Sequence, residues 1–391
     1  MTTGLLNGLR VLDFGQGVAG PYCAQLLGDH GADVIKIEPP HGDWSRGMGM
    51  ANDDGLTGTF LAVNRNKRGM SLDLRSEESV AVALELARKS DVLVESFRPG
   101  VMERLGLGFD NLRTDNASLV YCSVSGFGSS GPNVHKSAGD STMQAYGGLM
   151  SIIGEEDGPP LRVGNVVSDM LGGTNAFAGV LVALLARATD GQGRRVSTSL
   201  LDSMIAFQAP PLTEYLLTGV LPARAGNQHP LIAPSGAFAT TDGHVTMTVL
   251  AHQWDRFCRG LGLDQLVEDP RFATSNARQA HRHELNDLIA PIFSGSTCED
   301  ALSRLHELDI LCSPINDYSQ LVAEEQFRHN RLVRDASDDS GLPMVANPVK
   351  VDGDVLSCTA PPALGEHNRQ VLSDDLGWDD KRIERFLKKA S

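Results

Sequence analysis

The sequence has few aromatic residues, few cysteines and no long hydrophobic run. Aromatic residues make up 5% of the chain, and the six cysteines are scattered without a CxxC pair, which fits a reduced cytoplasmic protein without a zinc site. The longest apolar run, residues 176–186, is too short to cross a bilayer, and no secretory leader is visible. We therefore expect a cytoplasmic protein that neither binds a metal nor enters a membrane.

Positive charge is also scarce. The chain has 34 Lys and Arg against 49 Asp and Glu, which gives a net charge of −15. Nucleic acids and anionic membranes need clustered Lys and Arg, so neither is an expected partner. A local Arg cluster could still bind an anionic small ligand.

The 391 residues predict two lobes, and glycine is abundant with 41 copies. Short apolar segments alternate with helical segments through the first half, which predicts an α/β fold with a mostly parallel sheet. The predicted strands are residues 9–14, 33–38, 70–74, 91–97, 119–124 and 195–200.

The pattern changes after residue 204, where prolines mark a loop-rich connection. Residues 236–249 then predict a hairpin around Asp242-Gly243, and helical segments follow. We expect a large domain from residues 1–204 and 335–391, to which a C-terminal helix returns. A smaller domain spans residues 225–330, with linkers at residues 205–224 and 331–334.

A glycine turn follows the first predicted strand. Gly15, Gly17 and Gly20 have the GxGxxG spacing, and Glu38 ends the next strand, as in dinucleotide-binding folds. The same residues could form a tight turn that binds no dinucleotide. A second string of this spacing, at residues 126–131, shows how easily the pattern arises in a glycine-rich chain.

Two charged features are candidates for ligand binding or catalysis. Residues 64–68 (Asn-Arg-Asn-Lys-Arg) form either a solvated basic loop or a phosphate pocket. Asp169 precedes an apolar segment without charge until Arg187. Either Ser168 or Asp169 could cap a helix there, and the helix dipole would keep the Asp169 carboxylate ionised, as an anionic nucleophile requires.

Two hydrolase patterns fail. The second His of an HExxH zinc motif that starts at His283 would fall on Asp287, and the chain has no GxSxG elbow.

Many ordered segments together resemble the class III CoA-transferase family, the CaiB/BaiF type that includes formyl-CoA and carnitine CoA-transferases and α-methylacyl-CoA racemases. The resemblance covers nearly the whole chain. It rests on Asp169 and on residues 6–14, 19–21, 31–38, 64–68, 91–100 (Asp-Val-Leu-Val-Glu-Ser-Phe-Arg-Pro-Gly), 125–128, 158–160, 191–193 and 364–367.

The resemblance implies a Rossmann-like large domain formed by both chain ends, a smaller α+β domain, and a homodimer with interlocked subunits. It implies that the glycine turn belongs to a CoA-binding lobe. Asp169 would attack an acyl-CoA thioester and pass CoA to a small organic acid, with succinyl-CoA as a possible donor and no permanently bound cofactor. The implied CoA contacts are Gln16, Val18, Leu72, Arg75, Ser96, Phe97, Arg98, Arg104 and Lys136.

Three alternatives stay open. A racemase of this fold needs a His before the Asp of its Ala-Gly-His-Asp segment, but Gly139 stands there and His135 would have to take its place. An NAD(P)-dependent oxidoreductase would use the glycine turn and Glu38, and a CoA-binding subunit would have no activity of its own. Within the family, the formyl-CoA branch has a glycine run that this chain lacks and a basic residue where this chain has Pro39, so formyl-CoA:oxalate specificity is not expected.

Overall fold

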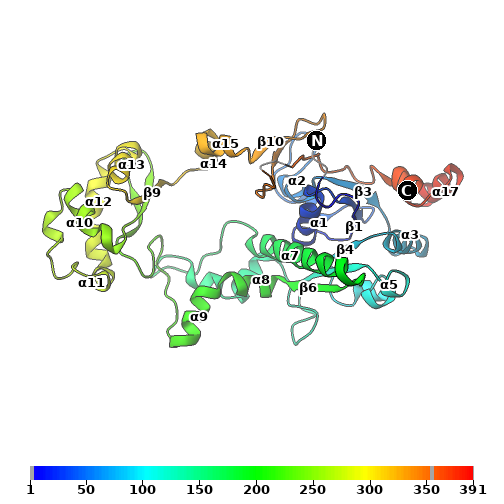
Figure 1. Cartoon of the computed structure of the whole chain (residues 1–391), viewed down its shortest axis with the longest axis horizontal. Helices are drawn as coiled ribbons and strands as arrows, with labels where there is room; N and C mark the ends of the chain where they lie inside the picture. The colour runs from blue at the N-terminus through cyan, green and yellow to red at the C-terminus, as the bar shows by residue number, and fades with distance from the viewer. Residues whose placement is uncertain (1–3, 353–355, 391) are drawn as a thin grey trace. The chain divides into compact units, whose positions relative to one another are not determined.

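The computed structural model describes residues 4–352 and 356–390, which divide into two compact units (Figure 1). The first unit contains residues up to 149 together with 163–217 and those from 328 onward. The second contains residues 150–162 and 218–327. The chain therefore enters and leaves the second unit from the first.

A six-stranded sheet forms the centre of the first unit, and all its neighbouring strands are parallel. Its strand order, β3-β2-β1-β4-β5-β6, is that of dinucleotide-binding α/β folds. This confirms the predicted α/β class with a parallel sheet. The strands are β1 (Arg10–Asp13), β2 (Asp33–Glu38), β3 (Lys67–Ser71), β4 (Val92–Glu95), β5 (Val120–Ser125) and β6 (Arg195–Ser199).

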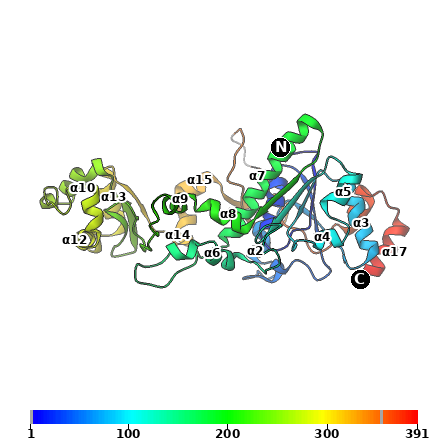
Figure 2. The ribbon, with the colours of Figure 1, turned by 90° about the horizontal axis from the view of Figure 1, so that it is seen from below.

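Side chains alternate across this sheet because successive residues of a strand point to opposite faces. In β4, Val92 and Val94 pack toward α1 and α7, whereas Leu93 packs into the cluster on the other face. Figure 2 shows α7 on one side of the sheet and α3, α5 and α17 on the other. Both faces are covered, which explains why β1, β2, β4 and β5 are mostly apolar and buried.

The helices of the first unit lie between the strands of the sheet in the chain or follow the last of them. They are α1 (Ala19–Asp29), α2 (Gly58–Asn64), α3 (Glu77–Arg88), α4 (Val101–Arg104), α5 (Phe109–Asp115), α6 (Asp140–Tyr146), α7 (Val167–Asp190), α8 (Leu200–Phe207) and α9 (Ala209–Thr218). Residues 205–224, predicted as a linker, thus contain the end of α8 and all of α9.

The C-terminal part returns to the first unit. The hairpin β10–β11 (Val333–Asp335 and Pro343–Val345) is followed by α16 (Asn368–Gln370) and α17 (Asp380–Ala390). Ile383 and Phe386 of α17 enter the core cluster that also contains Leu12 and Met70.

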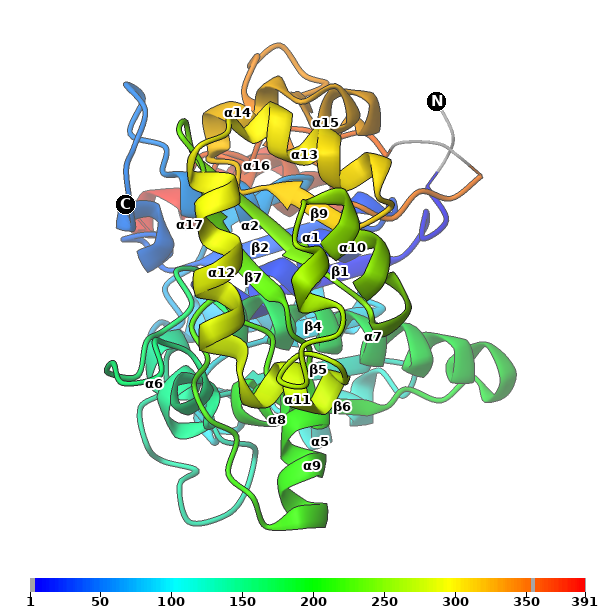
Figure 3. The ribbon, with the colours of Figure 1, turned by 90° about the vertical axis from the view of Figure 1, so that its left-hand side faces the viewer.

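The second unit has its own small sheet and core (Figure 3). Strands β7 (Ser235–Ala239) and β8 (His244–Thr248) form the predicted antiparallel hairpin, and β9 (Leu311–Pro314) pairs with β8. Its helices are α10 (Trp254–Gly260), α11 (Ser275–Ala280), α12 (Arg282–Ser294), α13 (Cys298–Glu307) and α14 (Tyr318–Ala323), and α15 (Glu325–Asn330) spans the boundary.

Helix α7 packs closely on α1 through two glycines. A Cβ atom at Gly173 would lie 2.7 Å from the Ala19 carbonyl oxygen, and one at Gly172 would lie 3.7 Å from the Ala19 side chain. By length and composition α7 could also cross a membrane, but the core helix of a soluble protein passes the same test. Here its buried face, which includes Ala176 and Val180, belongs to the core of the first unit.

We predict that Gly173→Ala destabilises the first unit by about 1–2 kcal/mol, because the new methyl group must push α7 away from α1 and outweighs the gain in helix propensity. Chemical denaturation measures the effect. Gly164→Ala is the matched control, since a Cβ there meets no atom within 4 Å. Equal stability of both variants would contradict this account of the packing.

Candidate active site

The sheet reverses its strand order between β1 and β4, and ligands of open α/β sheets bind at the carboxyl ends of such strands. The turn after β1 carries Gln16 and Val18, and the turn after β4 carries Ser96, Phe97 and Arg98. The Gln16 amide donates a hydrogen bond to the Ser96 hydroxyl at 3.0 Å. The fold thus brings these predicted CoA contacts together.

The backbone N–H groups of the glycine turn already have partners. The Gly15 amide donates to Asp13 Oδ1 at 2.8 Å, and the Gly17 amide donates to Asp43 Oδ1 at 2.9 Å. With Ser96 accepting from Gln16, three successive donors are bound to side chains of the protein. A dinucleotide-binding turn needs these donors for the pyrophosphate, and here two carboxylates occupy that place.

Glu38 is equally unavailable. Its side chain is fully buried and accepts two hydrogen bonds from Arg46, both at 2.7 Å, and a third from the Asp43 amide at 2.8 Å. It cannot also reach a ribose hydroxyl. Together with the bonded amides of the turn, this argues against the dinucleotide interpretation of the turn and Glu38.

Asp169 lies in the first turn of α7, but it is not the cap that we predicted. The helix begins at Val167, and Asp140 of α6 caps it from outside. Asp140 Oδ1 accepts hydrogen bonds from the amide of Ser168 at 2.8 Å and from its hydroxyl at 2.9 Å. The Asp169 side chain is therefore left free for another role at the helix N-terminus.

The electrostatics of Asp169 also differ from the prediction. Burial, with a further contribution from the Asp140 carboxylate, raises the pKa of Asp169 to about 7. This raised pKa contrasts with the full ionisation that we expected from the helix dipole. A carboxylate of raised pKa is more basic, and a more basic nucleophile is also more reactive.

α1 and α7 begin at the same edge of the sheet. Both are crossover helices of a parallel sheet and run against its strands, so their N-termini lie at the carboxyl edge. Since Gly173 packs on Ala19, the first turn of α7 with Asp169 lies near the turn that carries Gln16. The nucleophile candidate and the switch point therefore lie at the same edge of the sheet in the first unit.

The remaining predicted contacts differ in accessibility. Leu72 and Val18 have buried side chains, so a ligand could reach only their backbone. Arg98, Arg104 and Lys136 are exposed; Arg98 donates a hydrogen bond to Ser137 at 2.8 Å. Arg75 is exposed after β3 and pairs with Asp73 at 2.8 Å.

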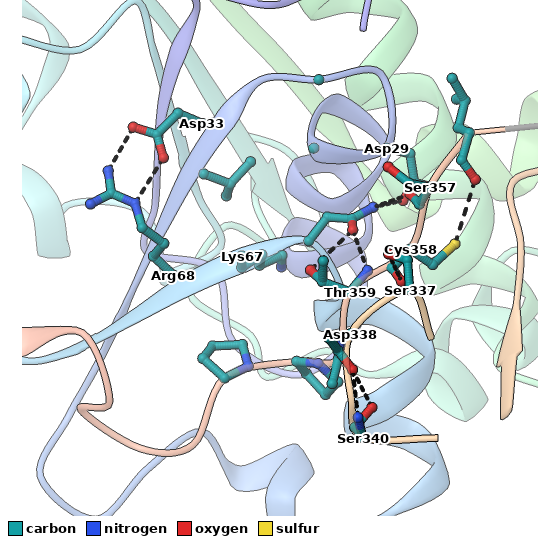
Figure 4. Close-up of a pocket in the computed structure, with 18 of the residues that line it drawn as sticks. Asp29, Asp33, Lys67, Arg68, Ser337, Asp338, Ser340, Ser357, Cys358 and Thr359 are labelled. Atoms are coloured by element: carbon teal, nitrogen blue, oxygen red, sulfur yellow. Dashed lines mark hydrogen bonds and ion pairs between the residues drawn. The ribbon is translucent and has the colours of Figure 1, made fainter. Parts of the chain in front are cut away.

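The basic segment at residues 64–68 is neither a loop nor a phosphate pocket. Arg65 pairs with Asp29, Lys67 with Asp13 at 2.8 Å, and Arg68 with Asp33 and Asp375. Figure 4 shows the Arg68 guanidinium facing Asp33. The three cations thus neutralise carboxylates of the first unit. This also explains why β3 begins at Lys67, three residues before the predicted start.

A cavity of about 1010 Å³ lies at the amino-terminal ends of β2 and β3, lined by residues that include Asp33, Arg68 and Ser337 (Figure 4). Asn66, Lys67 and Arg68 of the basic segment line it, but neither Asp169 nor any of the predicted CoA contacts does. In the described part of the chain, no group of three or more His, Cys, Asp or Glu is placed to hold a metal ion.

Three supporting residues were missed by the sequence reasoning. Asp140 and Asp43 anchor the two helix N-termini, and Glu95 accepts the Phe97 amide at 2.9 Å, while burial raises the pKa of Glu95 to about 7. Only Asp43 left a local signal, because Asp two residues before Ser is typical of a side-chain-capped turn.

Known proteins match the chain along its length. The family model of CoA-transferase family III matches residues 6–368. A succinyl-CoA–D-citramalate CoA-transferase of Chloroflexus aurantiacus is 36% identical, over 95% of this chain and 94% of that protein. A formyl-CoA:oxalate CoA-transferase of Streptomyces coelicolor is 33% identical, over 100% of this chain and 99% of that protein. The crystal structure of a CaiB/BaiF family protein from Brucella suis has a TM-score of 0.88 at 32% identity and covers 95% of this chain and 100% of that one.

We predict that Asp169→Asn raises the melting temperature by roughly 3–6 °C at pH 8 and has almost no effect at pH 4. The folded protein holds the Asp169 proton up to about pH 7 and the unfolded chain only to about pH 4, so wild-type stability falls as the pH rises between these values. The neutral amide removes that loss.

Thermal unfolding at both pH values measures this difference. Asp190→Asn is the matched control at the other end of α7, where hydrogen bonds, first from Arg194, lower the pKa of the carboxyl to about 2. This control should lower the melting temperature at pH 8. A pH-independent effect of Asp169→Asn would contradict the raised pKa.

Proposed function

The chain belongs to CoA-transferase family III, and we propose that it transfers CoA from an acyl-CoA to a small carboxylic acid with Asp169 as the nucleophile. The observation that carries this proposal is the position of Asp169. Asp169 lies in the first turn of α7 but does not cap the helix. It is placed at the carboxyl edge of the sheet, beside the switch point. Its raised pKa gives it the basicity that attack on a thioester needs.

The proposed reaction needs no redox partner. The Asp169 carboxylate attacks the thioester carbonyl, the C–S bond breaks, and a mixed anhydride and CoA thiolate form. The thiolate attacks the aspartyl carbonyl of the anhydride, which releases the donor acid and leaves an aspartyl-CoA thioester. The acceptor carboxylate displaces the thiolate to form a second anhydride. The thiolate then attacks the acceptor carbonyl, which yields the new acyl-CoA and restores the Asp169 carboxylate.

The site has the charges that this substrate requires. Arg98, Arg104 and Lys136 are exposed cations in the segments after β4 and β5, and they could bind the phosphates of CoA without being paired in the core. Ser96, Phe97 and the Gln16 side chain would line the path between these cations and Asp169, with Arg75 at the neighbouring strand end. Val18 and Leu72 would contribute backbone contacts.

The racemase alternative is weaker for a local reason. The residue before Asp140 is Gly139, which has no side chain to move a proton. Asp140 itself is occupied in capping α7. The pair of opposed bases that a racemase uses is therefore incomplete at this position.

Succinyl-CoA remains our candidate donor, and the Chloroflexus relative is named for this donor. The Streptomyces relative is named for formyl-CoA and oxalate, but the present chain has Pro39 and no glycine run. We propose a small organic acid as the acceptor and the cytoplasm as the compartment.

We predict that Asp169→Ala lowers the rate of CoA transfer at least about 1000-fold while the affinity for CoA changes less than about threefold. The wild-type protein, incubated with succinyl-CoA and then hydroxylamine, should give a hydroxamate on the peptide with Asp169. A screen of acyl-CoA donors against small dicarboxylates measures transfer, and mass spectrometry locates the adduct.

Asp190→Ala, at the other end of the same helix, is the control and should keep full activity. Full turnover by Asp169→Ala would place the nucleophile elsewhere. CoA should stabilise the wild-type protein against heat and NAD should not. Stabilisation by NAD alone would contradict a CoA site, and stabilisation by CoA without turnover of any donor would favour a CoA-binding subunit.

We also propose the interlocked homodimer. No residue of α9 is buried in the single chain, and Leu216 and Leu217 are 72% and 81% exposed. Apolar side chains gathered on one helix mark a surface for a partner, here a second copy of the chain.

Light scattering should therefore give twice the chain mass of 41.9 kDa. Changing both Leu216 and Leu217 to Glu should produce monomers, because two charges cannot be buried unpaired in an apolar interface. Tyr318→Glu, which alters an exposed aromatic residue of α14, should leave the dimer intact. A wild-type monomer at micromolar concentration would contradict the proposal.

A further inference from the structure

Gln16 is the one residue of the segment 11–20 that is not buried. The turn places this side chain at the surface of the carboxyl edge and hides its neighbours. Gly17 has φ +77°, and a Cβ there would lie 2.1 Å from the ring of Trp44, so this conformation of the turn requires glycine. The direction of the Gln16 side chain is therefore set by whatever holds the two peptide groups around it.

One buried ion pair holds both of these peptide groups. Lys36 Nζ donates a hydrogen bond to the Gly15 carbonyl at 2.9 Å, and Asp43 accepts the Gly17 amide at 2.9 Å. The two side chains bind each other at 2.9 Å, and both are fully buried. The ion pair thus brackets Gln16 from its N-terminal and C-terminal sides.

The Lys36–Asp43 ion pair is itself held in place by further hydrogen bonds. Asp43 also accepts the amide and hydroxyl of Ser45, each at 2.9 Å, and its own amide donates to Glu38. Burial alone would raise the pKa of Asp43, but Lys36 and the N–H donors outweigh it and lower the pKa. Asp43 is therefore an anion, and its carboxylate is held by four hydrogen-bond donors: the Gly17 amide, Lys36 Nζ, and the amide and hydroxyl of Ser45.

A simpler core would not need this pair. Replacing a buried ion pair by apolar residues is often neutral or stabilising, so such a pair is weak evidence for a role in stability alone. The ion pair also forms hydrogen bonds to the peptide groups on both sides of the partly exposed Gln16, which an apolar pair could not form. The pair therefore serves the geometry of the turn and not stability alone.

We propose that Asp43, through its ion pair with Lys36, is a positioning residue of the CoA-transfer site: it fixes the peptides on both sides of Gln16 and so aims the Gln16 side chain at the bound acyl-CoA. The inference rests on the proposed function, because it takes acyl-CoA as the ligand of this edge. Asp43 touches no substrate and acts only through the turn.

Loss of the Lys36–Asp43 ion pair should affect catalysis more than folding. We expect Asp43→Asn to lower kcat/KM about 10- to 100-fold, since a displacement of about 1 Å of a positioned group can cost about 100-fold. The control is Asp29→Asn, which breaks a comparable buried pair with Arg65 at the far end of α1. It should lower the melting temperature to a similar degree but change kcat/KM less than about threefold.

Two further variants separate positioning from folding. In Lys36→Met/Asp43→Asn the buried charges are gone, so the melting temperature should recover while kcat/KM stays low. In a background of Gln16→Ala, Asp43→Asn should cost less than about threefold more, because the side chain that it positions is already missing.

Steady-state kinetics with the donor and acceptor found for the wild-type protein, together with melting temperatures, provide the test. Recovery of kcat/KM along with stability in the double variant, or multiplicative losses in the Gln16→Ala background, would overturn the proposal. If the wild-type protein transfers no CoA, the proposed function is wrong. That result differs from one in which the wild-type protein is active but Asp43 does not position Gln16.

Discussion

Burying a charged group in a protein interior costs free energy unless an opposite charge and hydrogen bonds meet it, and the carboxyl edge of this sheet buries several. Asp13 pairs with Lys67, and Asp43 with Lys36, all four side chains being inaccessible to solvent. Burial lowers the pKa of Lys67 to about 8 although Asp13 opposes the shift. Removing any one partner would leave an uncompensated charge, which typically costs about 3–5 kcal/mol.

These pairs determine the geometry of the first unit around the site. Each carboxylate accepts a backbone amide of the glycine turn, Gly15 for Asp13 and Gly17 for Asp43. Asp169 has no such counter-charge: its nearest electrostatic influence after burial is another carboxylate, Asp140. The same region thus contains fully compensated carboxylates that shape the turn and one uncompensated carboxylate that is left reactive.

Much of this was predictable from the sequence. The alternation of apolar strands and helices predicted the parallel α/β sheet, and the Asp242-Gly243 pair predicted the hairpin, because both depend on local pattern. The role of residues 64–68 was not predictable, since the partners of Arg65 and Arg68, Asp29 and Asp33, lie more than 30 residues away.

The cap of α7 shows the same limit. Local sequence suggested that Ser168 or Asp169 would satisfy the helix N-terminus, whereas Asp140, 28 residues earlier, accepts the Ser168 amide. The raised pKa of Asp169 follows from burial and from this neighbour, and neither is visible in the sequence around it. The pairing of charged residues that are distant in the sequence could therefore not be predicted from the local sequence.

The occupied glycine turn has a consequence for selectivity. Cells contain abundant nucleotides whose pyrophosphates suit the N-terminus of a helix after such a turn. Here the amides of Gly15, Gln16 and Gly17 already donate to Asp13, Ser96 and Asp43, so the turn disfavours the competitors that its strand order would otherwise favour. The pyrophosphate of CoA must then bind elsewhere on the carboxyl edge of the sheet. The reacting end of the substrate thus meets a turn that is free of bound nucleotide.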